Sequence, residues 1–507
     1  MDYEPVIGLE THAELLTESK LWCPCSTRFG QAANSQTCPV CLGMPGSLPV
    51  LNVRAMELAL RAAIALRCTI NRNTFFDRKN YYYPDLPKNY QISQNYCNLG
   101  VDGYLDIPSN GGVQRVGILN VHLEEDAGKN LHAEAPGADY SLVDLNRAGI
   151  PLLEIVSAPD MHSAEEADSY MQTLRQVLLY TQVSSGKMQE GALRFEASIS
   201  MRPAGTQELG ARVEIKNLNS MKAVRLVLDY EIRRQSALLK EGKPVQRETR
   251  LWDEVRERSG RMRSKEEAQD YRYFPEPDLL PFEVDNEMMS RASTGVPELP
   301  LERRRRFCST LGLSKYDASV LTDERAVADY FESCLKVYNA PKSMANWIMN
   351  DVLRDVNERK MPITAFEVPP ERLAELARLT DEGKVNTNAA RSVLAKMVED
   401  AKAARNVGVV GTGEGAIQEQ EMGVPVVTIR PGELIEQMGL EQVSDEAALA
   451  PMVEQVIRDN PKAVQDYLAG KEQAVGPLVG EVMRLTRGKS DPRLVNKMLR
   501  ARLDTKG

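Results

Sequence analysis

Residues 118–129 restrict the fold most strongly, because they form a predicted strand that ends in a cluster of carboxylates. Apolar side chains at every second position of Leu119–Leu123 are typical of a strand with one buried face. The strand continues directly into Glu124, Glu125 and Asp126. Adjacent carboxylates repel one another unless cations lie between them. A solvated strand end before a glycine turn is the simpler interpretation of this stretch alone, so the rest of the chain has to decide.

Four other segments show the same alternation of apolar and polar side chains. They are residues 6–15, 150–156, 194–202 and 212–216. Glu154 lies inside an otherwise apolar run, where an unpaired carboxylate would cost several kcal/mol or more. Loops rich in Gly, Pro and Asn precede these strands and favour antiparallel pairing. A solvated polar face is the common alternative, but repeated Glu in phase with Arg favours a binding site.

The polar faces carry the groups that phosphoryl transfer requires, namely ligands for a metal ion and a cationic clamp. Carboxylate oxygens suit Mg²⁺, and guanidinium groups bind phosphate oxygens. The metal-ligand candidates are Glu10, His12, Glu124, Glu125, Glu154 and Glu214, and the phosphate-clamp candidates are Arg194, Arg202 and Lys216. The sequence contains no Walker A motif and no kinase glycine-rich loop, so a nucleotide site here would be of an unusual type.

Residues 77–94 interleave basic and aromatic side chains, among them Lys79 and Tyr81. The prolines of this stretch predict a long ordered loop rather than a regular element. Basic and aromatic groups together suit a phosphate with a base or sugar stacked beside it. Tyrosines that fix the loop to the core are the alternative interpretation.

Four of the eight cysteines form two short hooks, Cys23-Pro-Cys25 and Cys38-Pro-Val-Cys41. Two such hooks complete a tetrahedral shell, which predicts a closed and therefore structural zinc site. A redox dithiol is the alternative, although a redox motif normally stands alone before a helix.

The length of 507 residues predicts two to four domains. The net charge of −9 argues against binding of nucleic acid over most of the surface, but not against a local basic patch. No apolar run approaches the roughly 20 residues of a membrane span. The acidic N-terminus lacks the apolar core of a signal peptide. These features predict a cytoplasmic protein with reduced cysteines.

Beyond residue 298 the apolar side chains recur at helical spacing. The predicted helices are 303–311, 323–337, 370–379, 389–405, 446–458, 461–468, 470–486 and 491–503. The Gly- and Val-rich segment 407–431 is typical of a linker. Residues 461–507 carry ten Lys or Arg against five Asp or Glu. Such a basic tail suits contact with a phosphate backbone, and a solvated helical face is the alternative.

Several long motifs together resemble the B subunits of the bacterial aspartyl/glutamyl-tRNA amidotransferases, the GatB family. The motifs are Ile7–His12, the cysteine hooks with the following residues to Asn52, Asp77–Tyr81, His122–Lys129, Asn146–Ser157, Glu214–Ser220, Met262–Ala268 and Pro275–Leu279. The resemblance covers nearly the whole chain. The sequence departs from the family pattern at Arg194-Phe-Glu-Ala-Ser198, where family members usually read Arg-Cys-Asp-Ala-Asn.

The resemblance implies an α+β fold in three parts. Residues 1–292 would form a cradle domain on an antiparallel sheet with a zinc-binding loop, 293–405 an all-α helical domain, and 406–507 a linker and an all-α YqeY-like tail domain. It also implies an ATP-dependent carbon–nitrogen ligase. ATP would phosphorylate the side-chain carboxylate of Glu-tRNA(Gln) and/or Asp-tRNA(Asn), and ammonia from a partner glutaminase, the A subunit, would displace phosphate. A small C subunit would complete a heterotrimer.

The resemblance also implies roles for individual residues. Glu10, His12, Glu124, Glu125, Glu154 and Glu214 fall at metal-binding and ammonia-channel positions, with Mg²⁺ expected at Glu10, His12, Glu125 and Glu154. The residues expected to contact nucleotide and substrate are Lys79, Tyr81, Arg194, Glu196, Ser198, Arg202 and Lys216. The residues expected to bind zinc are Cys23, Cys25, Cys38 and Cys41. The residues expected to contact tRNA are Lys471, Arg484, Arg487 and Lys489. A non-catalytic tRNA-binding scaffold and a stand-alone metallohydrolase are the competing functions.

Overall fold

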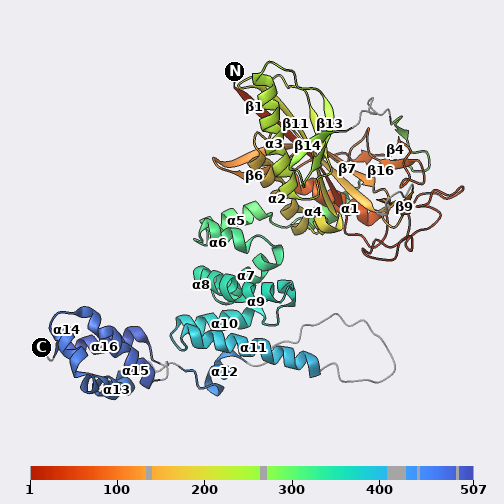
Figure 1. The fold of residues 1–507 in the computed structure, drawn as a ribbon. Helices are drawn as coiled ribbons and strands as arrows, with labels where there is room; N and C mark the ends of the chain where they lie inside the picture. The colour runs from red at the N-terminus through yellow and green to blue at the C-terminus, as the bar shows by residue number, and fades with distance from the viewer. Residues whose placement is uncertain are drawn as a thin grey trace. The chain divides into compact units, whose positions relative to one another are not determined.

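The structure is a computed structural model that describes residues 2–132, 140–262, 271–407, 430–441, 446–486 and 490–505. The chain divides into two compact units, 1–303 and 304–507 (Figure 1). A large sheet with helices forms the first unit, and helices form the second. The described part is therefore an α+β protein, as the sequence predicts.

The first unit is built on a 12-stranded sheet. The order of neighbouring strands along its main path is β14 (Arg258–Arg261), β13 (Glu248–Asp253), β12 (Val213–Lys216), β11 (Leu193–Pro203), β1 (Tyr3–Glu14), β10 (Pro151–Ser157), β7 (Gly112–Glu125), β5 (Tyr90–Ser93), β4 (Asp77–Asn80) and β15 (Phe274–Pro275). Two further strands lie off this path: β6 (Gly100–Ser109) pairs with β7, and β2 (Thr69–Ile70) pairs with β6. The five predicted strands are confirmed, and they pair antiparallel. The sheet as a whole is mixed, because β12 and β13 are parallel.

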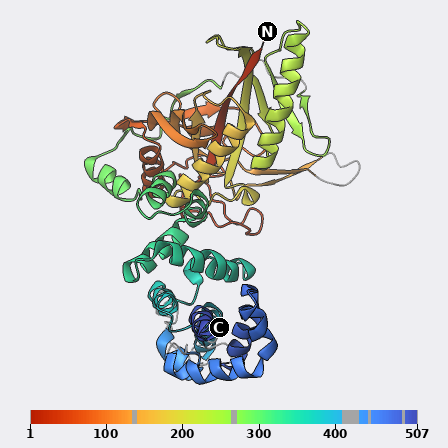
Figure 2. The ribbon, with the colours of Figure 1, turned by 90° about the vertical axis from the view of Figure 1, so that its left-hand side faces the viewer.

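The strands bury one face, and three long helices pack against the same hydrophobic core. Along β1 the side chains alternate between buried and partly exposed, so that Ile7 and Leu9 face the core while Glu10 and His12 face away. The helices are α1 (Val53–Ala65), α2 (Ala164–Tyr180) and α3 (Met221–Lys240), which begin after the capping side chains Asn52, Ser163 and Ser220. Figure 2 shows helices running beside the strands. The opposite face of the sheet stays free for polar groups.

One residue of the predicted apolar face lies on the polar side instead. The register of β7 against β10 shifts so that Val156 pairs with Asn120 and Ser157 with Ile118, which leaves Leu119 as an extra residue. Leu119 is consequently 49% exposed, and Ile118 takes its place in the core. The prediction for Leu119 was wrong because a β-bulge changes the phase of the alternation, which periodicity alone does not reveal.

The prediction of a loop at residues 77–94 was also wrong. Residues 77–80 and 90–93 form the hairpin strands β4 and β5, paired from Asp77↔Ser93 to Asn80↔Tyr90. Both prolines of the stretch, Pro84 and Pro87, lie in the connection between the strands, where no ladder hydrogen bond needs their missing N–H. The hairpin brings Lys79 and Tyr81 to the edge of β7.

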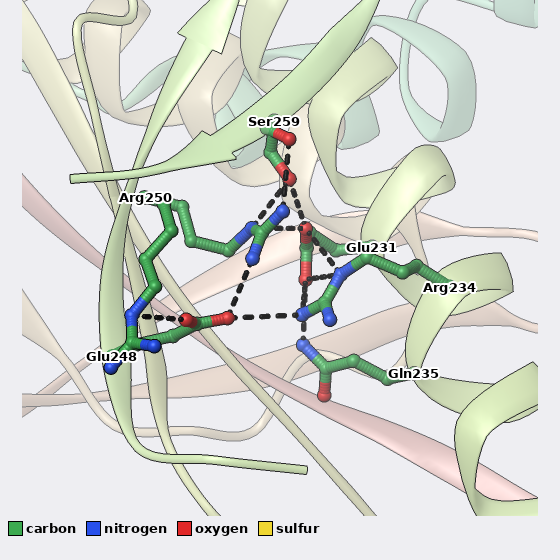
Figure 3. A network of polar contacts seen from close by, with 7 residues as sticks. Glu231, Arg234, Gln235, Glu248, Arg250 and Ser259 are labelled. Carbon is green, nitrogen blue, oxygen red and sulfur yellow. Dashed lines mark hydrogen bonds and ion pairs between the residues drawn. The ribbon is translucent and has the colours of Figure 1, made fainter. Parts of the chain in front are cut away.

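A buried polar network attaches β13 and β14 to α3 (Figure 3). The Glu231 carboxylate is fully buried and lies 2.6 Å from Arg234 Nη2 and 3.2 Å from Arg250 Nε. Gln235 donates to it at 3.0 Å, and Ser259 also donates to it. Every charge in this network has an opposite charge beside it, which burial requires.

Smaller elements complete the first unit. They are β3 (Asn73–Thr74) with β16 (Phe282–Glu283), β8 (Lys129–His132) with β9 (Ser141–Asp144), the 3₁₀ turn Met188–Glu190 and α4 (Asn286–Thr294). The helix α5 (Pro300–Ser309) crosses the boundary between the two units. No helix in the described ranges is long and apolar enough to span a membrane.

The second unit contains two separate hydrophobic clusters of helices. The first cluster is built by α6 (Lys315–Leu321), α7 (Arg325–Val337), α8 (Pro341–Trp347), a π-helical turn (Ile348–Val352), α9 (Leu353–Glu358), the 3₁₀ turn Ile363–Ala365, α10 (Pro370–Asp381), α11 (Thr387–Val407) and α12 (Pro431–Gln437), with residues from the end of α5. The second is built by α13 (Glu446–Asp459), α14 (Pro461–Leu468), α15 (Val475–Leu485) and α16 (Pro492–Asp504), and the 3₁₀ turn Glu472–Ala474 connects α14 to α15.

The predicted helices of this unit are confirmed with small shifts of their ends, with one larger exception. The helix predicted from Gly470 begins only at Val475. Gly470 has φ +92°, a left-handed conformation that ends the preceding helix and cannot continue it. Apart from its ends, the predicted linker 407–431 lies outside the described residues.

Candidate active site

Four adjacent strands place the predicted site residues in rows across the polar face. Counting across β11, β1, β10 and β7, the register aligns Arg194, His12, Glu154 and His122. The neighbouring row contains Glu196 opposite Glu10. Residues far apart in the chain therefore meet because strands pair in this order, and the alternation ensures that they share a face.

Glu154 is the centre of this arrangement. Its Oε2 atom lies 3.5 Å from His12 Nε2 and 3.4 Å from His122 Nε2. His12 Nε2 also lies 3.5 Å from Glu10 Oε1. Glu154 thus belongs to two groups of residues that could bind a metal ion, Glu10–His12–Glu154 and His122–Glu124–Glu154. In each group, one potential ligand atom per residue lies within 4.8 Å of those of the other residues.

The protonation of the cluster reflects its crowded charges. Burial raises the pKa of Glu10 to about 7, and the charge of Glu154 adds to this shift. Burial lowers the pKa of His12, but the hydrogen bond and charge of Glu154 outweigh it and raise this pKa to about 9. Burial opposes ionisation of Glu154, yet the two histidines hold its pKa well below the usual range. Protons on the histidines occupy the place that a divalent cation would take, so the donor set fits such an ion.

Glu124 joins this cluster to the hairpin β4–β5. Its carboxylate lies 3.4 Å from Lys79 Nζ and accepts a hydrogen bond from Gln91 Nε2 at 3.1 Å. Tyr81 in turn donates to Gln91 Oε1 at 2.8 Å. Gln91 is a site residue that the sequence reasoning missed. Its place opposite Lys79 in the hairpin would have indicated it, had residues 77–94 been recognised as two strands.

Glu125 lies apart from these groups, although it follows Glu124 directly. Its carboxylate pairs with Lys88 and accepts a hydrogen bond from the Ile92 backbone N–H at 2.9 Å. Burial raises its pKa, and Lys88 opposes this shift. In the described part of the chain, Glu125 is not a member of the groups that contain Glu154.

Arg194 faces a second acidic pair at the end of β1. Its Nη2 atom donates to Asp126 Oδ2 at 2.7 Å, and Arg147 Nε lies 3.5 Å from the same oxygen. Burial raises the pKa of Glu14 to about 7, and the charge of Asp126 contributes. Glu14, Asp126 and Arg147 were not among the sequence candidates, although the alternation of β1 already places Glu14 in line with Glu10.

The remaining candidates of β11 and β12 lie farther out on the same face. Glu214 pairs with Arg212 at 2.9 Å, and Arg212 Nε also donates to Ser198 Oγ at 3.1 Å. Lys216 Nζ lies 4.0 Å from Glu196, and Arg202 Nε lies 2.6 Å from Glu4 Oε1. A cavity of about 250 Å³ lies beside them. Its lining includes Gly8, Glu10, Leu119, Ser198 and Arg212.

The four hook cysteines come together as the spacing predicts. All four are free thiols, and their sulfur atoms lie within 4.8 Å of one another. A hydrogen bond from Cys23 lowers the pKa of Cys41 to about 4, whereas burial raises the pKa of Cys25 to about 11. The Cys38 backbone N–H also donates to Cys41 Sγ at 3.1 Å. Four sulfurs in this arrangement fit a zinc-binding loop.

The tail candidates are only partly described. Lys471 pairs with Asp466 at 2.9 Å and Arg484 pairs with Glu481, so both cations are locally compensated. Arg487 and Lys489 lie outside the described residues. On α16, the exposed Arg493 and Lys497 are four residues apart, and neither forms an ion pair within the described segments.

Two family models match the chain and cover most of it. The GatB/GatE catalytic domain matches residues 5–290, and the GatB domain matches residues 329–503. Both matches identify the chain as part of a multi-subunit, tRNA-dependent amidotransferase, with a YqeY domain in its C-terminal region.

Individual relatives agree over the full length. The chain is 48% identical to the B subunit of the aspartyl/glutamyl-tRNA(Asn/Gln) amidotransferase of Moorella thermoacetica and 47% identical to that of Caldanaerobacter subterraneus subsp. tengcongensis, in each case over 99% of this chain and 100% of the relative. The chain belongs to the family of aspartyl/glutamyl-tRNA(Asn/Gln) amidotransferase B subunits.

Proposed function

We propose that the polar face of the sheet binds ATP and Mg²⁺ and activates the aminoacyl group of Glu-tRNA(Gln), Asp-tRNA(Asn) or both. The observation that carries this proposal is the position of Glu154, which is shared by two groups of potential metal ligands. Lys79 and Arg194 lie at the edge of these groups, each beside a carboxylate. Phosphoryl transfer depends on such fixed charges and on positioning rather than on a covalent nucleophile.

In the proposed reaction an oxygen of the aminoacyl carboxylate attacks the γ-phosphorus of ATP, and ADP leaves. Ammonia then attacks the carbonyl carbon, and phosphate leaves as the carbon–nitrogen bond forms. Bound among Glu10, His12 and Glu154, Mg²⁺ would supply positive charge that neutralises phosphoryl oxygens. Glu154 holds both imidazoles in place, and Lys79 supplies a fixed positive charge next to Glu124.

The ammonia must come from another chain, because the sequence has four histidines and no recognisable glutaminase nucleophile. We therefore infer a partner glutaminase of the amidase family, the A subunit, with a small C subunit completing a cytoplasmic heterotrimer. The enzyme would be a carbon–nitrogen ligase with glutamine as amido donor.

We further infer that Cys23, Cys25, Cys38 and Cys41 hold a structural zinc ion, and that the tail binds tRNA. A closed set of four thiolates leaves no coordination position for a substrate, which supports a structural role. For the tail, the exposed pair Arg493 and Lys497 joins Lys471 and Arg484 as candidate contacts to phosphates.

The test replaces Glu154 by Gln in the reconstituted complex and measures ATP hydrolysis that depends on glutamyl-tRNA. The amide keeps the shape of the side chain but removes its charge, so the rate should fall by about 10²–10³-fold, as when one preorganised electrostatic group is lost. The exposed Glu283, replaced by Gln, is the matched control and should leave the rate unchanged. Wild-type turnover of the Glu154→Gln complex would instead favour a non-catalytic tRNA-binding scaffold.

A further inference from the structure

Lys20 lies just before Cys23, the first cysteine of the two hooks, and its side chain is fully buried. Lysine is almost never fully buried unless its charge is paired. The Nζ atom donates to the Leu145 carbonyl oxygen at 3.3 Å, and no carboxylate among the described residues lies within ion-pair distance of it. A carbonyl oxygen satisfies a hydrogen bond but does not neutralise a charge, so the ammonium needs an anion from elsewhere.

The cysteine cluster is the anion source next to Lys20. A methyl group built on Gly149 would meet Lys20 Cδ at 3.6 Å and Cys41 Cβ at 3.7 Å, so both side chains pack against the same point.

Glu125 is the competing counter-ion, because its Oε2 atom would lie 3.8 Å from the same methyl group. Its carboxylate already pairs with Lys88 and accepts the Ile92 N–H. Lys88 therefore balances Glu125, and the thiolates remain as partners for Lys20.

We propose that Lys20 is the buried counter-cation of the four-cysteine metal site and thereby sets its affinity for zinc. This inference rests on the proposed zinc site. A divalent ion bound by four thiolates keeps two negative charges in excess, and a buried ammonium offsets one of them. Groups outside the coordination shell tune metal affinity in this way by their charge and hydrogen bonds.

Backbone hydrogen bonds next to Lys20 connect the cysteine segment to the candidate active site. The Lys20 N–H donates to Cys25 O at 2.9 Å, and the adjacent Leu21 N–H donates to Gly149 O at 2.8 Å. The Gly149 N–H in turn donates to Asp126 O at 2.9 Å. A metal bound by the cysteines would therefore fix a loop whose backbone is hydrogen-bonded through Gly149 to Asp126.

The experiment compares the full-length wild type with Lys20→Met, which keeps much of the side-chain volume but removes the charge. Zinc content is measured by metal analysis, and zinc affinity by competition with a chelator. We expect one zinc per wild-type chain and an affinity about 10–100-fold weaker in the variant. Thermal unfolding in EDTA should show the metal-free variant at least as stable as metal-free wild type, because replacing a buried charge by an apolar group is often neutral or stabilising.

Two further variants make each outcome decisive. Lys20→Gln retains a donor for Leu145 O without the charge and should lose zinc affinity as Lys20→Met does, whereas the exposed Lys222→Met should not. Zinc affinity of Lys20→Met within threefold of wild type would overturn the inference. Zinc affinity retained in Lys20→Gln but lost in Lys20→Met would also overturn it, because the charge would then not be the cause. A metal-free Lys20→Met protein that fails to fold, or that unfolds earlier than metal-free wild type, would overturn it as well. Wild type with less than half an equivalent of zinc would refute the proposed zinc site itself.

Discussion

Two of the buried glutamates of the first unit, Glu231 and Glu154, have different surroundings. Glu231 has arginine partners, together with an amide and a hydroxyl (Figure 3). Glu154 has histidine partners, and the partly exposed Glu10 lies beside them. Arginine cannot lose its proton in a protein, whereas histidine exchanges its proton near neutral pH. The Glu231 network therefore has one charge state and holds the fold together, while the Glu154 cluster can release protons, as the proposed binding of a cation requires.

The largest effect should follow from breaking the network with permanent charges. Glu231→Gln removes the fully buried carboxylate that Arg234 and Arg250 share and leaves, among the described residues, only Glu248 beside them, which should cost about 3 kcal/mol of unfolding free energy. Metal-free Glu154→Gln should cost about 1 kcal/mol or less, because His12 and His122 can shed their protons. Urea unfolding of both variants measures the difference. Equal losses of unfolding free energy would show that arginine and histidine partners make no difference to the stability of the two clusters.

The second prediction concerns pH. Protons on His12 (pKa about 9) and Glu10 (pKa about 7) must leave before a cation binds, so Mg²⁺ affinity should rise with pH between 6 and 9. The expected change is about ten- to a hundredfold per pH unit, for one or two displaced protons. Both folded-state pKa values lie above their ordinary values, so the stability they contribute to the metal-free protein is present at low pH. It is lost between about pH 4.5 and 7 for Glu10 and between about pH 6.5 and 9 for His12.

Isothermal titration of Mg²⁺ in buffers of different ionisation enthalpy counts the released protons directly. The Glu10→Gln variant has one titrating group fewer and should show a shallower pH dependence. An affinity that stays constant from pH 6 to 9 would contradict the proposed ligand cluster.

A smaller effect is expected from Gln91, the neutral link between the hairpin and Glu124. Gln91→Met removes the donor to Glu124, and a hydrogen bond to a charged group contributes about 1.5–3 kcal/mol. We expect kcat for tRNA-dependent ATP hydrolysis to fall about tenfold or more, with KM for ATP little changed. Tyr81→Phe removes only the next link and should have a smaller effect. A change confined to KM would assign Gln91 to substrate binding instead.

The smallest effects should appear in the tail, where compensated and uncompensated surface charges can be compared. Arg493→Gln with Lys497→Gln should weaken tRNA binding a few-fold and reduce the slope of log affinity against log salt by about two. Lys471→Gln with Arg484→Gln should change the slope less, because each of these cations already has a carboxylate partner. Filter binding of tRNA across a salt series gives both slopes, and a larger change for the second pair would reverse the assignment.

The sequence predicted the strands well because side-chain alternation is a local property of the chain. It placed Glu10, His12 and Glu154 on polar faces, and the two cysteine hooks came together as their spacing implies. It could not predict which of these faces meet, because strand order depends on packing between distant segments. The bulge at Leu119 follows from that pairing. The separation of Glu125 from Glu124 follows instead from the alternation, which points adjacent side chains of a regular strand to opposite faces, as the sequence predicts.

The sequence also could not predict contacts between side chains that lie far apart in the chain. Lys20 lies in a polar stretch, Thr17–Lys20, that gives no sign of burial, and its surroundings come from Leu145 and Gly149. Glu231 likewise has the composition of an exposed helix face until the strands β13 and β14 cover it. In both cases the environment is built by segments that no local pattern connects.

The position of β1 at the centre of the sheet has a consequence for synthesis. The ribosome makes this strand before both of its neighbours, β10 (Pro151–Ser157) and β11 (Leu193–Pro203). At about 5–20 residues per second, the second neighbour is complete only about 10–40 s after β1. Until β10 is complete, Ile7 and Leu9 of the nascent chain have neither strand to pair with, so β1 should be a binding site for chaperones during translation.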